Sequence, residues 1–261
     1  MLPALWVSKT GLSAQDMNLT TISNNLANVS TTGFKKDRAE FQDLLYQVRR
    51  QPGANTTQDT ELPSGLQLGT GVRIVGTQKN FNGGSLQTTD QPLDMAINGR
   101  GFFQILTPDG TVAYTRDGTF HLNAEGQVVT ANGYALEPAI VVPPETQSFT
   151  VGQDGTVSVT LFGDPASQVI GNLQTADFIN PAGLQAVGSN LFLETTASGA
   201  PQVGQPGANG LGVVLQETLE NSNVSTVEEL VNMITTQRAY EMNSKVISTA
   251  DSMLGFVTQQ L

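Results

Sequence analysis

The two ends of the chain carry the same seven-residue repeat of apolar side chains. The repeat comprises Leu5, Leu12, Leu19 and Leu26 near one end, and Met233, Tyr240, Ile247 and Leu254 near the other. This spacing is typical of helices that pack along their length. We therefore expect a long helix over residues 4–29, a second one over roughly the last 36 residues, and contact between the two.

Local signals mark where these helices begin and end. The sequence Ser225-Thr226-Val227-Glu228 has the form of a capping box, and acidic residues are favourable in the positively polarised first turn of a helix. At the other end, Gly33 follows a run of Ser and Thr. We expect Gly33 to adopt the left-handed conformation that closes the first helix.

The middle of the chain has a strand pattern instead. Short β-branched runs are separated by the turn dipeptides Asp109-Gly110, Asp117-Gly118, Glu125-Gly126, Asn132-Gly133 and Asp154-Gly155. Most of these recur every seven or eight residues, which is the spacing of short antiparallel strands joined by tight turns. We expect an antiparallel β domain over residues 96–185.

The expected fold class is therefore α+β. Paired long N- and C-terminal helices, packed like a coiled coil, enclose an inserted antiparallel β domain with extended connections. The predicted parts are residues 1–32 and 222–261 for the terminal helices, 33–95 and 186–221 for the connections, and 96–185 for the β domain. Residues 46–71 are rich in Pro, Gly, Asn, Gln and Thr, which is typical of a loop or linker.

Composition argues against enzymatic chemistry. The chain has no cysteine and one histidine, His121, so thiol chemistry, a Ser-His-Asp triad and a histidine-rich metal site lack support. Paired acids have simpler roles: Glu228 and Glu229 suit a helix start, and Asp90 and Asp94 suit turns. We expect no catalytic, cofactor-binding or metal site, and no cofactor.

Charge is unevenly distributed. The net charge is -11, and residues 117–237 contain twelve acids but neither Lys nor Arg, whereas bases gather at Lys35, Lys36, Arg38, Arg49 and Arg50. This balance argues against nucleic acid or an anionic membrane as a partner. The two sections could complement each other between copies, or the acids could simply form a soluble surface.

The first residues, MLPALWVSKTGL, lack a basic segment followed by an unbroken apolar core. We therefore expect neither a cleaved Sec signal nor membrane insertion.

Three asparagines, Asn24, Asn25 and Asn28, lie at the end of the first predicted helix. Asparagine is a poor helix former because its amide competes for backbone groups. One interpretation is a solvated helix face. The other is burial between packed helices, where a polar residue fixes register, with Asn232 and Asn243 as counterparts.

Several motifs carry a resemblance to a known family. The pattern SNNLANVSTTGFK at residues 23–35, the segment at 229–254, and the central sequences NGRGFFQI and YTRDGTFHLNAEGQVVTANGYAL are similar to those of bacterial flagellar rod and hook proteins. The resemblance extends over nearly the whole chain. It implies a structural subunit that stacks into a helical tube walled by terminal helices.

The resemblance also implies a place and partners. Such subunits lie in the flagellar basal body, span the periplasm and leave the cell unfolded through the flagellar type III export apparatus. Their partners are further copies, other rod subunits, the hook protein and the ring proteins that act as a bushing. Residues 45–72 most resemble the extra segment of distal rod subunits, which implies a rigid drive shaft that transmits torque from the motor to the hook.

The candidate site residues follow from the patterns of the two terminal helices and from the family resemblance. The expected assembly interface comprises Leu5, Leu12, Leu19, Ile22, Asn24, Asn25, Leu26, Asn28, Val29, Gly33, Phe34, Leu230, Met233, Tyr240, Asn243, Ile247 and Leu254. The expected rod-stiffening segment comprises Tyr46, Arg49, Arg50, Pro52, Leu62, Pro63 and Leu66.

Two alternatives remain at this stage. Within the same family, the chain could be a hook or proximal rod subunit, which the segment at 46–71 argues against. In a different class, it could be a secreted β-rich glycan-binding protein or a peptidoglycan hydrolase, which the absent catalytic set and the matched terminal repeats argue against.

Long isolated helices are marginal in water, because their stability comes mainly from packing. We expect both termini to be mobile in a dilute monomer and ordered when several copies pack together. Amide hydrogen exchange should therefore be fast at both ends in dilute solution and slow in the assembled form. Strong protection of both ends in the monomer would contradict this.

Overall fold

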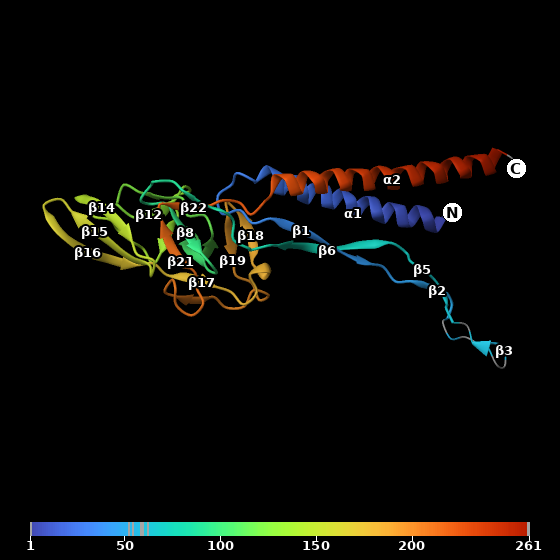
Figure 1. Ribbon diagram of the computed structural model, residues 1–261, viewed down its shortest axis with the longest axis horizontal. Helices are drawn as coiled ribbons and strands as arrows, with labels where there is room; N and C mark the ends of the chain where they lie inside the picture. The colour runs from blue at the N-terminus through green and yellow to red at the C-terminus, as the bar shows by residue number, and fades with distance from the viewer. Residues whose placement is uncertain (1, 52, 54, 58–59, 62, 260–261) are drawn as a thin grey trace. The chain divides into compact units, whose positions relative to one another are not determined.

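The computed structural model describes residues 2–259 apart from 52, 54, 58, 59 and 62. Contacts along the chain divide it into two compact units, which we call the helical unit and the β unit. The helical unit is Met1–Ala27, Asp37–Gln78 and Ser225–Leu261, and the β unit is Asn28–Lys36 and Lys79–Val224. The fold is α+β: among the described residues the two α-helices lie near the two ends of the chain, and the strands lie between them (Figure 1).

The helical unit contains two long helices, α1 (Leu2–Ala27) and α2 (Thr226–Gln259). They lie side by side and antiparallel, so that the N- and C-termini are at the same end of this unit (Figure 1). Helix α2 begins directly after Ser225, as predicted, and carries Glu228 and Glu229 in its first turn. None of the described helices is long and apolar enough to cross a membrane.

Helix α1 ends earlier than expected. The prediction that Gly33 closes this helix is wrong, because α1 stops at Ala27 and a turn follows in which the Thr31 N–H donates to the Asn28 carbonyl. The run Val-Ser-Thr-Thr that follows Asn28 is β-branched and hydroxyl-rich, and such residues favour leaving a helix. Gly33 is nonetheless left-handed, with φ of 68°.

Narrow two-stranded ribbons complete the helical unit. They are β1 (Asp37–Asp43) with β6 (Val72–Lys79), β2 (Gln47–Arg50) with β5 (Leu66–Leu68), and β3 (Asn55–Thr57) with β4 (Thr60–Glu61). The stretch 46–71, which the sequence predicts as a loop, thus contains four short paired strands in its described part. Strands this short leave little periodic signal in a sequence.

The β unit is built from short antiparallel strands. In chain order they are β7 (Leu86–Thr88), β8 (Met95–Asn98), β9 (Phe102–Leu106), β10 (Val112–Thr115), β11 (Phe120–Leu122), β12 (Val128–Thr130), β13 (Ala135–Glu137), β14 (Thr146–Val151), β15 (Thr156–Leu161), β16 (Asp164–Asn172), β17 (Thr175–Asp177), β18 (Gln185–Gly188), β19 (Leu191–Leu193), β20 (Gln202–Gly204), β21 (Val213–Gln216) and β22 (Thr218–Glu220). A short 3-10 helix, Pro181–Gly183, precedes β18.

Among the described residues, the largest sheet has nine strands, in the order β11-β12-β13-β9-β10-β19-β18, with β17 and β20 joined to it through β9. Strands β14, β15 and β16 form a separate sheet, and β8 with β21 and β7 with β22 form pairs. Residues 186–221, which the sequence places in a connection, therefore hold five strands or parts of strands. These strands are mostly three or four residues long, too short to show a pattern.

Strand β9 explains why the β unit folds around two cores. The side chains of Phe103 and Ile105 belong to one apolar cluster, whereas Phe102 belongs to the other. Alternate residues of a strand point to opposite faces, so both faces of β9 are covered. A strand buried on both sides has few polar residues, and in FFQI only Gln104 is polar and it is buried as well.

Four of the five predicted turn dipeptides are turns. Gly110, Gly126, Gly133 and Gly155 have φ between 76° and 83° and connect paired neighbouring strands. The prediction of a hairpin turn at Asp117-Gly118 is wrong. Gly118 packs against the backbone of Met95, where an added Cβ would lie 1.5 Å from the carbonyl oxygen. Here glycine permits close approach of two backbone segments.

Candidate assembly surfaces

The contact line between α1 and α2 consists of small and polar residues. The Asn18 Nδ2 donates to the Thr236 Oγ1 at 3.1 Å, and a Cβ added to Gly11 would lie 3.2 Å from the Asn243 Nδ2. Near the open end, Ala4 lies beside the buried Ala250. Successive members of this seam are seven residues apart on each helix, in opposite directions, as antiparallel packing requires.

The predicted leucine repeat flanks this seam. Half-buried members of the expected interface in the helical unit are Leu5, Leu12, Leu19, Leu26, Met233, Asn243, Ile247 and Leu254; Ile22 is buried, and Asn24, Leu230 and Tyr240 are exposed. The leucines are therefore only partly covered within one chain. Four expected members, Asn28, Val29, Gly33 and Phe34, belong to the β unit.

The three asparagines have separate environments. Asn25 is buried, its Nδ2 donates to the Asp37 carbonyl, and its Oδ1 accepts from the Asp37 N–H, both at 2.9 Å. Asn25 therefore does not fix register between helices within the chain. Its amide imitates a strand neighbour and holds the last turn of α1 against the start of β1. Asn28 accepts from the Thr31 hydroxyl at 3.2 Å, and Asn24 is exposed.

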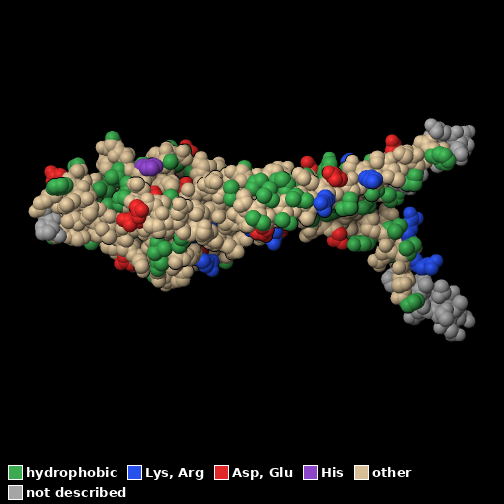
Figure 2. Space-filling view, turned by 45° about the horizontal axis from the view of Figure 1, so that its top comes forward, with side chains coloured by type: hydrophobic (Ala, Val, Ile, Leu, Met, Phe, Trp, Pro, Cys, Tyr) green, Lys and Arg blue, Asp and Glu red, His purple; other side chains and the backbone are tan. Residues whose placement is uncertain are grey.

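Helix α2 has a second apolar face. Large side chains that are 47% or more exposed are Val227, Val231, Ile234, Met242, Val246, Met253 and Phe256. Most of their spacings are three, four, seven or eight residues, which places them on one side of a helix. This side faces largely away from the buried Thr236, and near the end of α2 its residues Val246 and Met253 line a groove together with the buried Ala250. Figure 2 shows the apolar side chains along this surface of the helical unit.

The rod-stiffening candidates lie on the β2 and β5 ribbon and beside it. Tyr46, Arg49, Arg50, Pro63 and Leu66 are exposed, whereas Pro52 and Leu62 lie outside the described residues. Leu45 is 90% exposed, and Val48 and Leu68 are also open to solvent. A two-stranded ribbon with bare apolar side chains is marginal by itself, so this segment is suited to cover another surface.

A buried ionic cluster closes the β unit. The Glu220 carboxylate lies 2.6 Å from the Lys35 Nζ and 3.2 Å from the Arg116 Nη1, and all three side chains are at most 4% exposed. The Gly84 N–H also donates to this carboxylate at 2.8 Å. The Gly33 N–H donates to the Glu220 carbonyl, so side chain and backbone together join residues 33–35 to β22.

The two cations make further contacts within this cluster, although the buried Nε of Arg116 has no hydrogen-bond partner among the described residues. Arg116 donates further to the carbonyls of Ile97 and Gly99, and its guanidinium lies 5.3 Å above the Phe102 ring. Burial lowers the pKa of Lys35 and of Arg116, and the Glu220 carboxylate opposes this in both cases. The cluster is thus a structural element in which each charge requires the others.

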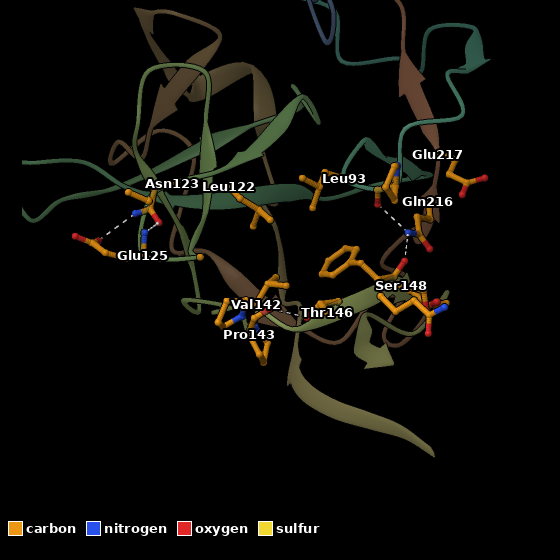
Figure 3. Close-up of a pocket in the computed structure, with 17 residues that line it drawn as sticks. Leu93, Leu122, Asn123, Glu125, Val142, Pro143, Thr146, Ser148, Gln216 and Glu217 are labelled. Carbon is orange, nitrogen blue, oxygen red and sulfur yellow. Dashed lines mark hydrogen bonds between the residues drawn. The ribbon is translucent and has the colours of Figure 1, made fainter. Parts of the chain in front are cut away.

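The β unit also has a pocket of about 870 Å³, lined by the turn at 122–126, by β14 and by Gln216 (Figure 3). Gln216 braces it: the Nε2 donates to the carbonyls of Pro92 and Phe149, and the Oε1 accepts from the Val151 N–H. The residues that line it include no histidine, cysteine or basic side chain. The exposed His121 lies on β11, opposite Val129.

No group of three or more His, Cys, Asp or Glu side chains suited to a metal occurs in the described part of the chain. Neither the pocket nor the ionic cluster brings together a nucleophile and a base. The arrangement therefore supports packing against other protein surfaces, and nothing in it resembles a reaction centre.

Sequence reasoning missed the partners that complete these surfaces. Glu220, Arg116 and Gln216 were not singled out, since key partners of each lie far away in the sequence, for example 185 residues for Glu220 with Lys35, 104 for Arg116 with Glu220 and 65 for Gln216 with Val151. The one available signal was Glu220 itself, an acid in an apolar strand pattern. The seam residues Gly11 and Asn18 were hidden beside the stronger leucine repeat.

Comparison with known proteins gives concordant results along the chain. Family models match residues 5–35 (flagella basal body rod protein), 96–159 (flagellar hook protein FlgE/F/G D1 domain) and 215–260 (flagellar basal body rod FlgEFG protein C-terminal). The chain is 55% identical over 99% of its length to the whole flagellar basal-body rod protein FlgG of Buchnera aphidicola subsp. Schizaphis graminum.

Relatives from other bacteria give the same result. Identity is 48% to FlgG of Caulobacter vibrioides, over 99% of both chains, and 37% to FlgG of Bacillus subtilis, over 97% of both. These similarities do not support the alternative interpretation of the chain as a glycan-binding protein or a peptidoglycan hydrolase.

Replacing Glu220 with Gln should destabilise the β unit by about 3–5 kcal/mol, because both buried cations lose their counter-charge. Amide exchange of β9, in the centre of the largest sheet, measures this stability in the full-length chain. Glu145→Gln, at an exposed carboxylate of the same unit, should change it by less than about 0.5 kcal/mol. Equal losses in both variants would contradict the role of the cluster.

Proposed function

The chain belongs to the FlgG family of flagellar basal-body rod proteins, and on this premise we propose that it forms the distal rod by polymerising with copies of itself into a rigid helical tube. It is a structural protein of the flagellar basal body and not an enzyme. It assembles with other axial components of the flagellum.

The second apolar face of α2 is the observation that carries the proposal. A continuous apolar stripe on the exposed side of a long helix favours burial against another surface. Within one chain, α1 covers one side of α2 and leaves Val231, Ile234 and Met242 at least half exposed. A neighbouring copy is the simplest cover for the other side. Contacts between unlike surfaces that do not close into a ring produce a helical tube.

We assign the assembly role to the terminal ranges 1–32 and 222–261, packed like a coiled coil. The half-covered members of the predicted interface, such as Leu12, Leu19 and Ile247, become buried when copies associate. Asn24 and Tyr240 are exposed in the single chain and lie at the edges of such contacts. The β domain at 96–185 and the connections at 33–95 and 186–221 form the layers around the tube.

We assign the segment at 46–71 to stiffening. Its bare apolar and basic side chains suit a neighbouring copy's acidic β unit, because residues 117–237 contain no Lys or Arg. A tube braced in this way resists bending and transmits torque from the motor to the hook.

The remaining proposals rest on family membership. The rod spans the periplasm, and its partners beyond further copies are other rod subunits, the hook protein, the ring proteins and the export apparatus. Subunits leave the cell through the type III route without a cleaved Sec signal.

Electron microscopy of the concentrated full-length protein tests polymerisation. We expect regular tubes from the unchanged chain and dispersed protein from Val231→Gln with Ile234→Gln, since these changes remove apolar surface that the single chain leaves exposed. The control carries Val169→Gln with Val187→Gln, at exposed positions of the β unit, and should form tubes. Equal polymerisation of both double variants would refute the role of this face.

Replacing residues 46–71 with a Gly/Ser linker of equal length tests the stiffening role. We expect tubes that bend more easily, or no tubes, because the linker keeps the connection but removes the side chains that brace neighbours. Tube curvature in the micrographs gives the bending stiffness. Unchanged stiffness would refute this role and leave polymerisation unaffected.

A further inference from the structure

The single tryptophan, Trp6, has an unusual position on α1. Its side chain is 57% exposed, and the Lys9 Nζ lies 5.3 Å from the ring centroid. Trp6 is two residues from Ala4 and five from Gly11, so it projects from the side of α1 roughly opposite the seam. Met17, which is 37% exposed, lies three turns further along on the same side as Trp6. A large aromatic side chain left open to water is a common anchor of protein interfaces.

Helix α2 offers a groove that suits such a ring. The groove measures about 510 Å³ and is lined by residues of α2 together with Ala4 of α1; the α2 residues are Met242, Lys245, Val246, Thr249, Ala250 and Met253. Methionine side chains are flexible and form favourable contacts with aromatic rings. The described residues leave this groove open to solvent.

Trp6 cannot fill the groove of its own chain. Ala4, which borders the groove, projects from the other side of α1. The ring and the groove are thus two distinct surfaces of one helical unit, and contact between them joins two copies. We propose that Trp6 of one copy inserts into the Met242–Met253 groove of the next copy. This inference rests on the proposed function and names the contact that joins adjacent subunits.

Charge complementarity supports the register of this contact. Copies in a helical polymer share one axial direction, so α1 of one copy runs antiparallel to α2 of the next, as in the pair within a chain. With Trp6 beside Val246, Asp16 lies ten residues along α1 and Arg238 lies eight residues back along α2, so the two charges differ by only about 3 Å in axial position. Both Asp16 and Arg238 are exposed. In this arrangement the Trp6 ring leaves Lys9 of its own chain and meets Lys245 in the groove of the next copy. A cation–π contact is therefore retained.

Tryptophan fluorescence of the full-length chain tests the insertion directly, because Trp6 is the sole tryptophan. On polymerisation we expect emission at shorter wavelength and several-fold weaker quenching by acrylamide. Val246→Gln with Met253→Gln should raise the critical concentration several-fold, whereas Val169→Gln with Val187→Gln should leave it unchanged. Tubes in which Trp6 stays quenchable would overturn the inference and leave the proposed function standing. Absence of tubes at any concentration would instead overturn the proposed function, and this inference with it.

The register is tested by charge reversal. Asp16→Lys and Arg238→Asp should each raise the critical concentration, and the two changes together should restore it to within about twofold of the unchanged chain if the pair contacts across copies. Additive losses in the double variant would overturn the proposed register.

Discussion

Three buried charges define the β unit. The Glu220 carboxylate is the only anion within reach of both Lys35 and Arg116 among the ion pairs of the described residues. Each charge has been removed from water and is tolerated only because the others are present. Through them, the segment that enters the β unit and the strand that leaves it are held together. The cluster also contacts the aromatic core, since the guanidinium of Arg116 lies over the Phe102 ring.

The helical unit, unlike the β unit, leaves most of its large apolar side chains outside its internal contacts. Its internal seam is formed by small and polar residues, among them Gly11, Asn18 and Thr236, which permit close approach but bury little apolar surface. Its large apolar side chains lie mostly at the flanks and on the far side of α2. The two helices of one chain therefore share little buried apolar surface, and many of their large apolar side chains remain exposed. Any stability gained by association of copies through these side chains, as proposed above, depends on protein concentration.

Much of the fold could be predicted because its signals are local. The heptad repeats located both helices, the capping sequence located the start of α2, and four Gly-containing turns located the hairpins. Features that depend on distant partners could not be predicted. Gly118 resembles a turn residue in sequence but serves backbone packing against Met95, and the amide of Asn25 is engaged by Asp37. The contact of Glu220 with Lys35 has no local signal at all.

The separation of Lys35 and Glu220 along the chain has a consequence for timing. Closing a loop of 185 residues is entropically costly, and contacts between distant residues slow folding. Until β22 has left the ribosome, Lys35 and Arg116 have no counter-charge. A shorter nascent chain therefore cannot form the ionic cluster with Glu220. The β unit therefore acquires its closed form only when nearly the whole chain has been made.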